Sequence, residues 1–258
     1  MFMGVDIGSA ASKCVIINDA SEVVAQTAIP SGTGTSGPQR AADKALEEAG
    51  IGMEQVSCVI ATGYGRQTFK AADGRISELS CHAKGAVWIL PTVRTVIDIG
   101  GQDAKALSIS EGGKLTNFVM NDKCAAGTGR FLDVMARVLE VDIRMLAELD
   151  AKADGIVPIS STCTVFAESE VISQLAKNVP VTNIVAGIHQ SAAARAASLM
   201  KRVGITEPVL MTGGVANNAG VVRALQRMLG VEIRTSPYSQ TAGALGAALL
   251  ARERLEKE

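Results

Sequence analysis

The sequence predicts an α/β protein of two lobes related by internal duplication. Two apolar strands each end near an aspartate with a glycine two residues later, at Asp6 in MGVDIGSAASK and at Asp98 in TVIDIGGQDAK. Each of these strands is followed by two further strands and then by helices, so one order of elements occurs twice. A chain of 258 residues, of which 47% are hydrophobic, has enough apolar surface to form two packed lobes.

The elements of the first half follow from apolar runs, helical periodicity and turn residues. We expect strands at residues 3–7, 13–17, 22–29 and 56–61, helices at 39–49 and 77–90, and a flexible loop at 31–38.

The second half repeats this order and then adds helices. We expect strands at 95–99, 106–110, 115–120, 208–211 and 231–235, and helices at 130–140, 141–149, 163–178, 182–203, 217–229 and 238–258. The last helix is expected to pack back on the first half. The predicted lobes are therefore residues 1–93 with 236–258, and residues 94–235.

Two turns, DIGSAASK at 6–13 and DIGGQDAK at 98–105, predict phosphate binding. Glycine has no Cβ, so a phosphate can approach the backbone closely. A third glycine segment, TGG at 212–214, follows a later strand and indicates a nucleotide. The expected phosphate-binding amides are those of Gly8, Ser9, Gly100 and Gly101.

Side chains near these turns suggest the remaining chemistry of a nucleotide site. Asp6 and Asp98 are expected to hold Mg²⁺ through water molecules, since Mg²⁺ keeps several of its own waters. Lys13 is expected to reach a phosphate, and Gln102 to orient an attacking water. Further along the chain, the nucleotide-binding residues are expected to be Gly213, Gly214 and Asn217, the last of which opens the next helix. The alternative for each turn, taken alone, is a plain hairpin.

Two cysteines each precede a predicted helix, Cys124 in NDKCAAGTGRFLDV and Cys163 in SSTCTVFAESEVISQ. A thiolate is favoured there by free backbone N–H groups and by the helix dipole. The bland alternative is two buried free cysteines. If cysteines hold a metal centre, one chain does not offer four evident ligands, but two chains would. The other cysteines, Cys14, Cys58 and Cys81, have no such motif and are expected to be structural.

Charge and composition exclude several classes of protein. The net charge is −1, with both signs spread along the chain, so nothing favours nucleic acid or a membrane surface. No apolar run reaches the length of a membrane span. The chain opens directly on a strand without a targeting pattern, and the odd cysteine number argues against disulfides, so we expect a cytoplasmic protein.

The motifs resemble a known family. DIGSAASK, DIGGQDAK and MTGGVANN look like the acetate/sugar kinase–Hsp70–actin superfamily, which has a duplicated actin-like (RNase H-like) ATPase fold with a nucleotide cleft between its lobes. Within that superfamily the two cysteine motifs resemble the ATP-dependent activators of 2-hydroxyacyl-CoA dehydratases, in the BadF/BadG/BcrA/BcrD ATPase group. TGYGR at 62–66, SELSCHAKGA at 77–86 and TSP…GALGAAL near the C-terminus also match, so the resemblance covers the whole chain.

The resemblance implies ATP binding and hydrolysis coupled to electron transfer. It implies a homodimer with one [4Fe–4S] cluster bridging the subunits, ligated by Cys124 and Cys163 of both. A ferredoxin or flavodoxin would reduce the cluster, and ATP would drive one electron onto an iron–sulfur dehydratase in anaerobic amino-acid fermentation. Activators for glutaryl, lactyl, phenyllactyl and isocaproyl substrates would share these motifs, as would activators of benzoyl-CoA reductases and double-cubane-cluster reductases.

Two other functions are compatible with this fold. A small-molecule kinase would share both phosphate turns, but it gives no reason for Cys124 and Cys163. An actin-like filament or chaperone ATPase would require additional binding domains, for which this sequence shows no segment.

Overall fold

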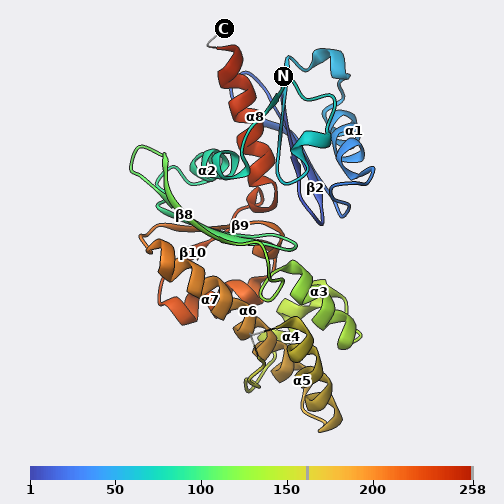
Figure 1. Ribbon diagram of the computed structural model, residues 1–258, viewed down its shortest axis with the longest axis vertical. Coiled ribbons are helices and arrows are strands. Elements are labelled where there is room, and N and C mark those ends of the chain that lie inside the picture. Colours follow the sequence, from blue (N-terminus) through green and yellow to red (C-terminus); the bar gives the residue numbers. More distant parts are fainter. Residues whose placement is uncertain (161–162, 257–258) are drawn as a thin grey trace. The chain divides into compact units, whose positions relative to one another are not determined.

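The computed structural model describes residues 1–160 and 163–256 (Figure 1). These residues form two compact units. Unit 1 contains residues 1–93, 109–116 and 236–256, and unit 2 contains residues 94–108, 117–160 and 163–235. Two sequence predictions partly lie outside the described residues: positions 161–162 of the second cysteine motif and positions 257–258 of the final helix.

Unit 1 is built on a five-stranded mixed sheet with the order β3-β2-β1-β4-β5. The central strand β1 pairs antiparallel with β2 and parallel with β4, and β2 pairs antiparallel with β3. The strands are β1 (Phe2–Ile7), β2 (Ser12–Ile17), β3 (Val23–Ile29), β4 (Cys58–Thr62) and β5 (Gly74–Arg75). All residues of β1 and β4 are buried, as expected for strands covered on both faces.

Helices cover both faces of this sheet. One core lies between the sheet and α1 (Gly37–Ala49), and a second lies between the sheet and α8 (Ala242–Leu255), which also packs on α2 (Glu78–Ile89). The approach of α8 to β1 is so close that a Cβ on Gly4 would lie 2.0 Å from the Ala244 carbonyl oxygen. The final helix therefore packs on the N-terminal sheet, as predicted.

A second sheet, which belongs mostly to unit 2, repeats the same topology in the order β10-β9-β6-β7-β8. Its strands are β6 (Thr95–Ile99), β7 (Ala104–Ile109), β8 (Leu115–Asn121), β9 (Val209–Thr212) and β10 (Ile233–Arg234). Here β6 takes the place of β1, because it pairs antiparallel with β7 and parallel with β9. This correspondence confirms the duplicated α/β fold predicted from the repeated strand pattern.

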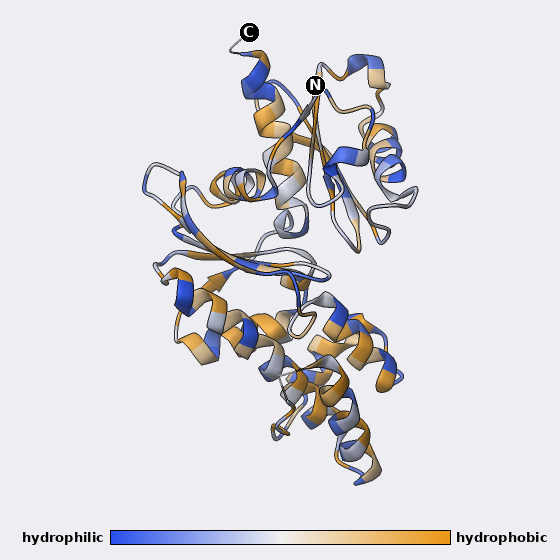
Figure 2. Ribbon diagram, in the orientation of Figure 1, coloured by the Kyte–Doolittle hydropathy of each residue, from blue (hydrophilic) through white to orange (hydrophobic). Residues whose placement is uncertain are grey.

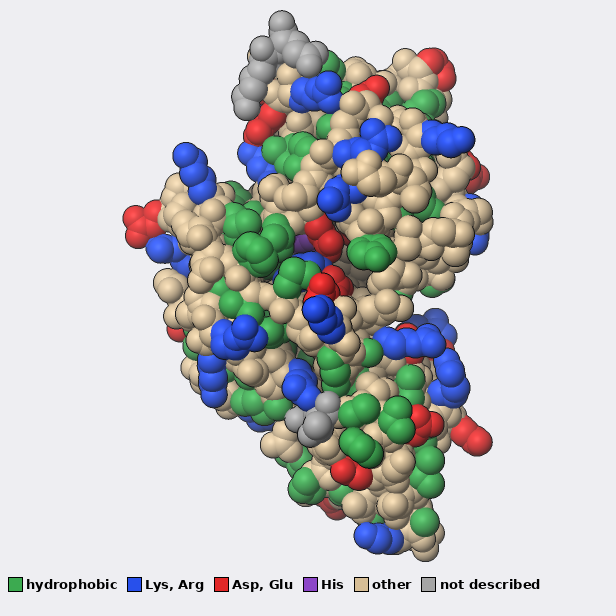
Figure 3. Space-filling model, in the orientation of Figure 1, with side chains coloured by type: hydrophobic (Ala, Val, Ile, Leu, Met, Phe, Trp, Pro, Cys, Tyr) green, Lys and Arg blue, Asp and Glu red, His purple; other side chains and the backbone are tan. Residues whose placement is uncertain are grey.

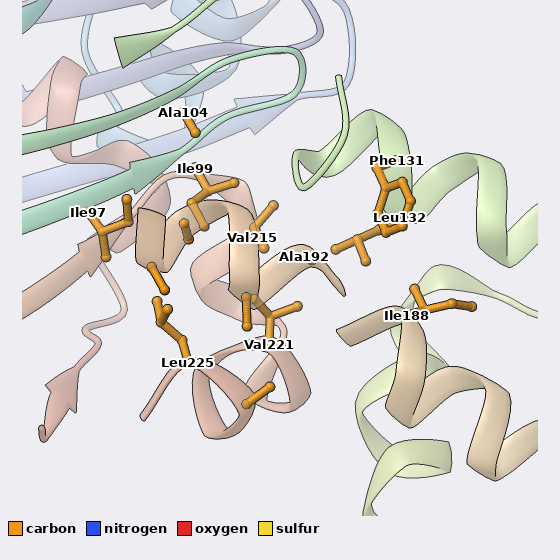
Figure 4. Close-up of a cluster of buried hydrophobic side chains, with 14 of the residues drawn as sticks. Ile97, Ile99, Ala104, Phe131, Leu132, Ile188, Ala192, Val215, Val221 and Leu225 are labelled. Carbon is orange, nitrogen blue, oxygen red and sulfur yellow. The ribbon is translucent and has the colours of Figure 1, made fainter. Parts of the chain in front are cut away.

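The helices of unit 2 enclose the larger apolar core. They are α3 (Gly129–Val138), α4 (Leu146–Ala151), α5 (Thr164–Ala176), α6 (Val181–Val203) and α7 (Ala219–Leu229). Figure 4 shows Phe131 and Leu132 of α3 extending toward α6, while Val215, Val221 and Leu225 lie near Ile97 and Ile99 of β6. In Figure 2, helices such as α1 and α7 alternate between hydrophobic and hydrophilic residues, as helices with one buried side do.

Several boundaries differ from the sequence predictions. The helix expected at 141–149 is a 3₁₀ turn, Ile143–Met145, followed by α4, because the Asp142 side chain accepts a hydrogen bond from the Arg144 amide at 2.9 Å and starts a new turn. Helix α1 begins two residues early, with Pro38 in its first turn. The two-residue strand β5 was not expected. Further 3₁₀ turns lie at Met53–Gln55, Arg66–Thr68, Gly214–Asn217 and Ser239–Thr241.

No helix among the described residues is long and apolar enough to cross a membrane.

Candidate nucleotide-binding turns and cysteine pair

The first candidate turn connects β1 to β2 in unit 1. Asp6 near the end of β1 is the register partner of Lys13, and Lys13 Nζ lies 3.1 Å from Asp6 Oδ2. Asp6 is only 3% exposed, and its Oδ1 has no hydrogen-bond partner among the described residues. A buried carboxylate oxygen without a donor is costly unless a ligand satisfies it, and a water bound to a metal ion is such a ligand.

The second candidate turn connects β6 to β7 in unit 2, and its aspartate has a different environment. Asp98 is the register partner of Lys105, whose Nζ lies 3.7 Å from Asp98 Oδ2 and also contacts Asp103 Oδ2. Asp98 Oδ1 accepts a hydrogen bond from Thr212 Oγ1 at 2.9 Å. Lys105 is buried, whereas the equivalent Lys13 is partly exposed, so the two turns have diverged in charge and accessibility.

The backbone amides of the two turns are not all available to a ligand. The Gly8 amide donates to the Ala11 carbonyl at 3.0 Å, and the Gly100 amide donates to the Asp103 carbonyl at 2.9 Å. These hydrogen bonds close each hairpin, so the Gly8 and Gly100 amides, both expected to bind phosphate, already have partners in this structure. The amides of Ser9 and Gly101 remain candidates, and the side chain of Gln102 is exposed within the second turn.

The third glycine segment follows β9. Gly213 has a positive φ of 84°, and a Cβ there would lie 2.3 Å from the Ile99 carbonyl oxygen, so this position requires glycine. Gly214 and Asn217 bound a 3₁₀ turn. The sequence predicted that Asn217 opens the next helix, but its neighbour Asn218 caps α7 by accepting hydrogen bonds from the amides of residues 220 and 221.

The cysteines fall into two groups by burial. Cys124 and Cys163 are partly exposed, whereas the other three are buried. Burial raises the pKa of Cys81 to about 12, and it also raises the pKa of Cys14, so these thiols stay protonated. Their burial agrees with a structural role. The partly exposed pair does not fit the alternative of two buried cysteines.

Cys163 and Cys124 reach their helices differently. Cys163 has an extended backbone and is the N-cap residue of α5, beside the free amides of that helix. Cys124 lies four residues before Thr128, the N-cap of α3, and its carbonyl accepts a hydrogen bond from Asn121 Nδ2 at 2.9 Å. Only Cys163 therefore occupies the position at the helix terminus that the sequence suggested for both.

Helix α5 carries exposed hydrophobic side chains next to Cys163. Val165, Phe166 and Ile172 are 64%, 63% and 52% exposed, whereas Ala167 and Val171 on the same helix are buried. Helix α5 packs against α3 within unit 2. Figure 3 shows hydrophobic side chains at the surface over the region of these helices. Three large apolar side chains exposed on one helix make this helix a candidate surface for contact with another molecule.

Sequence reasoning did not single out Asp103, Thr128 or Asn218, which the structure places in or beside the candidate site. The sequence holds a signal for Asp103, because this acidic residue stands two positions before Lys105, at the start of a strand whose apolar pattern predicts burial. Thr128 and Asn218 follow ordinary capping patterns, and only their tertiary contacts distinguish them.

The fold and the two Asp-Ile-Gly turns define a duplicated α/β protein of the ATPase class, and comparisons with known proteins agree. The model of the BadF/BadG/BcrA/BcrD ATPase family matches residues 3–251. The chain is 57% identical over 256 residues to the activator of lactoyl-CoA dehydratase of Anaerotignum propionicum, covering 99% of each chain. It is 58% identical to the (R)-2-hydroxyglutaryl-CoA dehydratase activating ATPase of Acidaminococcus fermentans, covering 99% of this chain and 98% of the other.

A solved structure shows the same fold. It is the activator of the 2-hydroxyisocaproyl-CoA dehydratase from Clostridium difficile with bound ADPNP, with a TM-score of 0.97, 53% identity, and coverage of 100% of this chain and 96% of that chain. This protein belongs to the BadF/BadG/BcrA/BcrD ATPase family.

Proposed function

We propose that this protein is an ATP-hydrolysing activator that delivers one electron at low potential to an iron–sulfur 2-hydroxyacyl-CoA dehydratase. The observation that carries the proposal is its similarity to two dehydratase activators along nearly the whole length of each chain. The paired turns and the two partly exposed cysteines supply the groups that such a protein requires.

For the nucleotide, we assign the phosphates to the amides of Ser9 and Gly101 and to Lys13. Gly213 and Gly214 allow close approach to the nucleoside. Asn217 lies at the end of the same turn. The family match and the ADPNP-bound structural relative support nucleotide binding.

For Mg²⁺, the residues fit a water-mediated site. The buried Asp6 Oδ1 has no donor among the described residues, so it can accept a hydrogen bond from a metal-bound water. Asp98 already accepts from Thr212, so its contribution is to orient such waters through its remaining lone pairs. Gln102, exposed within its turn, is assigned to orient the attacking water.

For the cluster, Cys124 and Cys163 are the two thiols that fit. They are partly exposed, and Cys163 lies at a helix N-terminus, beside the free backbone amides of that helix. A [4Fe–4S] cluster needs four thiolates, so two chains related by a two-fold axis supply them. When bound, the cluster supplies the single electron, which it receives from a ferredoxin or flavodoxin. The exposed side chains of Val165, Phe166 and Ile172 are then covered by the second subunit or by the dehydratase.

Anaerobic purification tests this proposal. We expect a brown dimer with about four irons and four sulfides per dimer, and ATP-dependent reduction of a 2-hydroxyacyl-CoA dehydratase. A colourless protein that phosphorylates a small molecule would establish the kinase alternative instead. If the protein reduces a benzoyl-CoA reductase or a double-cubane-cluster reductase but no dehydratase, the ATPase assignment stands and the proposed partner is wrong.

A further inference from the structure

We propose that Thr128 is the positioning residue that transmits the state of the second phosphate turn to the Cys124 segment. This inference rests on the proposed function, which places a nucleotide at the second turn and a metal cluster at Cys124. It assigns a role to a residue that neither binds phosphate nor holds the cluster.

The first observation is that α3 begins directly on the phosphate turn. The amides of its first two residues, Gly129 and Arg130, donate to the carbonyls of Gly100 and Gly101 at 2.9 and 2.8 Å. A Cβ on Gly129 would lie 3.2 Å from the Gly100 oxygen, so the contact is tight. The first amides of a helix have no partner within the helix, and here the carbonyl groups of the turn supply two of those partners.

The second observation concerns the peptide unit between Gly100 and Gly101. Its carbonyl accepts from α3, and its N–H is the candidate phosphate donor. Because a peptide unit is planar, these two groups cannot turn independently. When the Gly101 amide reorients toward a phosphate, the Gly100 carbonyl must move with it, and the start of α3 must follow or lose a hydrogen bond.

The third observation is the use of the Thr128 hydroxyl. Thr128 is fully buried and has the extended backbone of an N-cap residue, yet its side chain does not cap the helix. Its Oγ1 lies within hydrogen-bond distance of two carbonyl oxygens, that of Gly101 at 3.1 Å and that of Ala125 at 2.7 Å, and its single proton is shared between them. The hydroxyl thus joins the phosphate turn to the residue immediately after Cys124.

The segment that receives this contact is short and packed. The Thr128 amide donates to the Ala125 carbonyl at 3.0 Å, and Asn121 Nδ2 donates to the Cys124 carbonyl. Gly127 has a φ of 83°, and a Cβ there would lie 2.7 Å from Arg195 Cβ on α6. Because this segment is hydrogen-bonded and closely packed, we expect a displacement of Thr128 to displace Cys124 as well.

The first turn provides an internal comparison. Its equivalent carbonyl, that of Gly8, accepts a hydrogen bond from the Thr33 amide at 2.9 Å. Thr33 lies in the loop before α1, four residues ahead of that helix. Among the hydrogen bonds of the described residues, only the second of the two duplicated turns is bonded to the first residues of a helix, and that helix is preceded by Cys124.

The test measures the alkylation rate of Cys124 by iodoacetamide in the full-length protein freed of its cluster, with Cys163 measured in the same sample. Rates are compared without nucleotide, with Mg-ADP and with a non-hydrolysable Mg-ATP analogue. We expect the nucleotide to change the Cys124 rate about five-fold or more, the lower end of typical coupling between sites.

Thr128→Val removes the hydroxyl but keeps the shape of the side chain. In this variant, nucleotide should change the Cys124 alkylation rate by less than about two-fold. Thr128→Ser keeps the hydroxyl and should restore the change. The matched control is Thr27→Val, because Thr27 is also a buried threonine that donates to a backbone carbonyl, that of Ala41 at 2.8 Å, but in unit 1. Thr27→Val should keep the full nucleotide-dependent change in the Cys124 alkylation rate.

A full nucleotide-dependent change in folded Thr128→Val would overturn the link. If that variant does not fold, hydrogen exchange of the wild-type protein decides. Nucleotide should then slow exchange at the amides of Gly129, Arg130 and residues 124–127 together, and unaltered exchange there would overturn it. Nucleotide binding is measured separately in each protein. A wild-type protein that binds no nucleotide contradicts the proposed function, whereas one that binds nucleotide without any response at Cys124 contradicts only this inference.

Discussion

His189 Nδ1 lies 3.5 Å from Asp150 Oδ1, with both side chains buried in unit 2. The other oxygen of Asp150 accepts a hydrogen bond from Arg223 Nη2 at 2.6 Å, and His189 Nε2 lies 3.1 Å from Nδ2 of Asn218, the cap of α7. This polar group joins α4, α6 and α7 inside an otherwise apolar core. It also connects the segment between Cys124 and Cys163 to the loop that follows Gly213.

The first prediction concerns acid stability. Burial acts to raise the pKa of Asp150, but its contacts with His189 and Arg223 outweigh burial and lower the pKa. A carboxyl whose pKa is lower in the folded state stabilises the protein above its unfolded value of about 3.9. That stabilisation is lost as the pH falls through the folded value. Asp150→Asn should therefore lower stability at pH 7 by about 1–3 kcal/mol and flatten the loss of stability below pH ~4.

Thermal unfolding between pH 2 and 7 checks this expectation. Asp133→Asn is the matched control, because Asp133 is an exposed aspartate of the same unit. An Asp150→Asn protein with the wild-type acid transition would show that the carboxylate is not stabilised by its buried partners.

The second prediction concerns the cysteine pair. Cys124→Ser and Cys163→Ser should each lose bound iron and weaken the dimer, because each removes two of the four thiolates of the shared cluster proposed above. Cys58→Ala should keep both properties, since Cys58 is buried in the core of unit 1. Iron content and sedimentation of anaerobic samples give the result. An iron-replete, dimeric Cys163→Ser protein would refute the ligand assignment.

The third prediction separates metal binding from hydrolysis. Asp6→Ala should weaken Mg-nucleotide binding, because it removes the buried oxygen that has no donor among the described residues. Gln102→Ala should keep nucleotide affinity and lower kcat, by roughly 10²-fold if the side chain orients the attacking water. Isothermal titration and single-turnover hydrolysis distinguish the two effects. Asp19→Asn, an exposed change on the β2–β3 hairpin, should alter neither. Unchanged turnover in both test variants would place the catalytic site elsewhere.

Apolar runs, helical periodicity and turn residues predicted most of the fold, because strands, helices and turns depend mainly on residues that are close in the sequence. The apolar strands that lead to Asp6 and Asp98, with a glycine two residues after each aspartate, identified the duplication. The family match confirms the family that the motifs suggested. The strands β5 and β10 have two residues each and are too short for periodicity to detect or delimit.

The site was predicted less completely, because its details depend on tertiary contacts. Adjacent asparagines, Asn217 and Asn218, are equally good caps by sequence, and only the turn before α7 decides between them. The hairpin closure that occupies the Gly8 and Gly100 amides depends on backbone geometry. His189 and Asp150 lie on different helices, so no spacing rule could pair them.

The last prediction is that nucleotide changes the reduction potential of the cluster-bearing protein. The hydrogen bonds from Gly129 and Arg130 to the second phosphate turn give this coupling a physical route, because they attach the helix that follows Cys124 to the turn. Coupling between two sites is typically about 1–3 kcal/mol and is reciprocal for equilibrium binding. A tenfold change in equilibrium constant is ~59 mV for a one-electron couple, so the potential should shift by about 40–130 mV.

The midpoint potential is measured without nucleotide, with Mg-ADP and with a non-hydrolysable Mg-ATP analogue, together with the rate of iron removal by a chelator in each state. Reciprocity adds a second requirement: the affinity for the ATP analogue must differ between the oxidised and reduced protein by the same factor. Asp6→Ala, which should weaken Mg-nucleotide binding, is the control, and its potential should not respond at nucleotide concentrations that saturate the wild type. Equal potentials and equal chelation rates in all three states of the wild type would mean that the ATPase has no mechanical link to the cysteines.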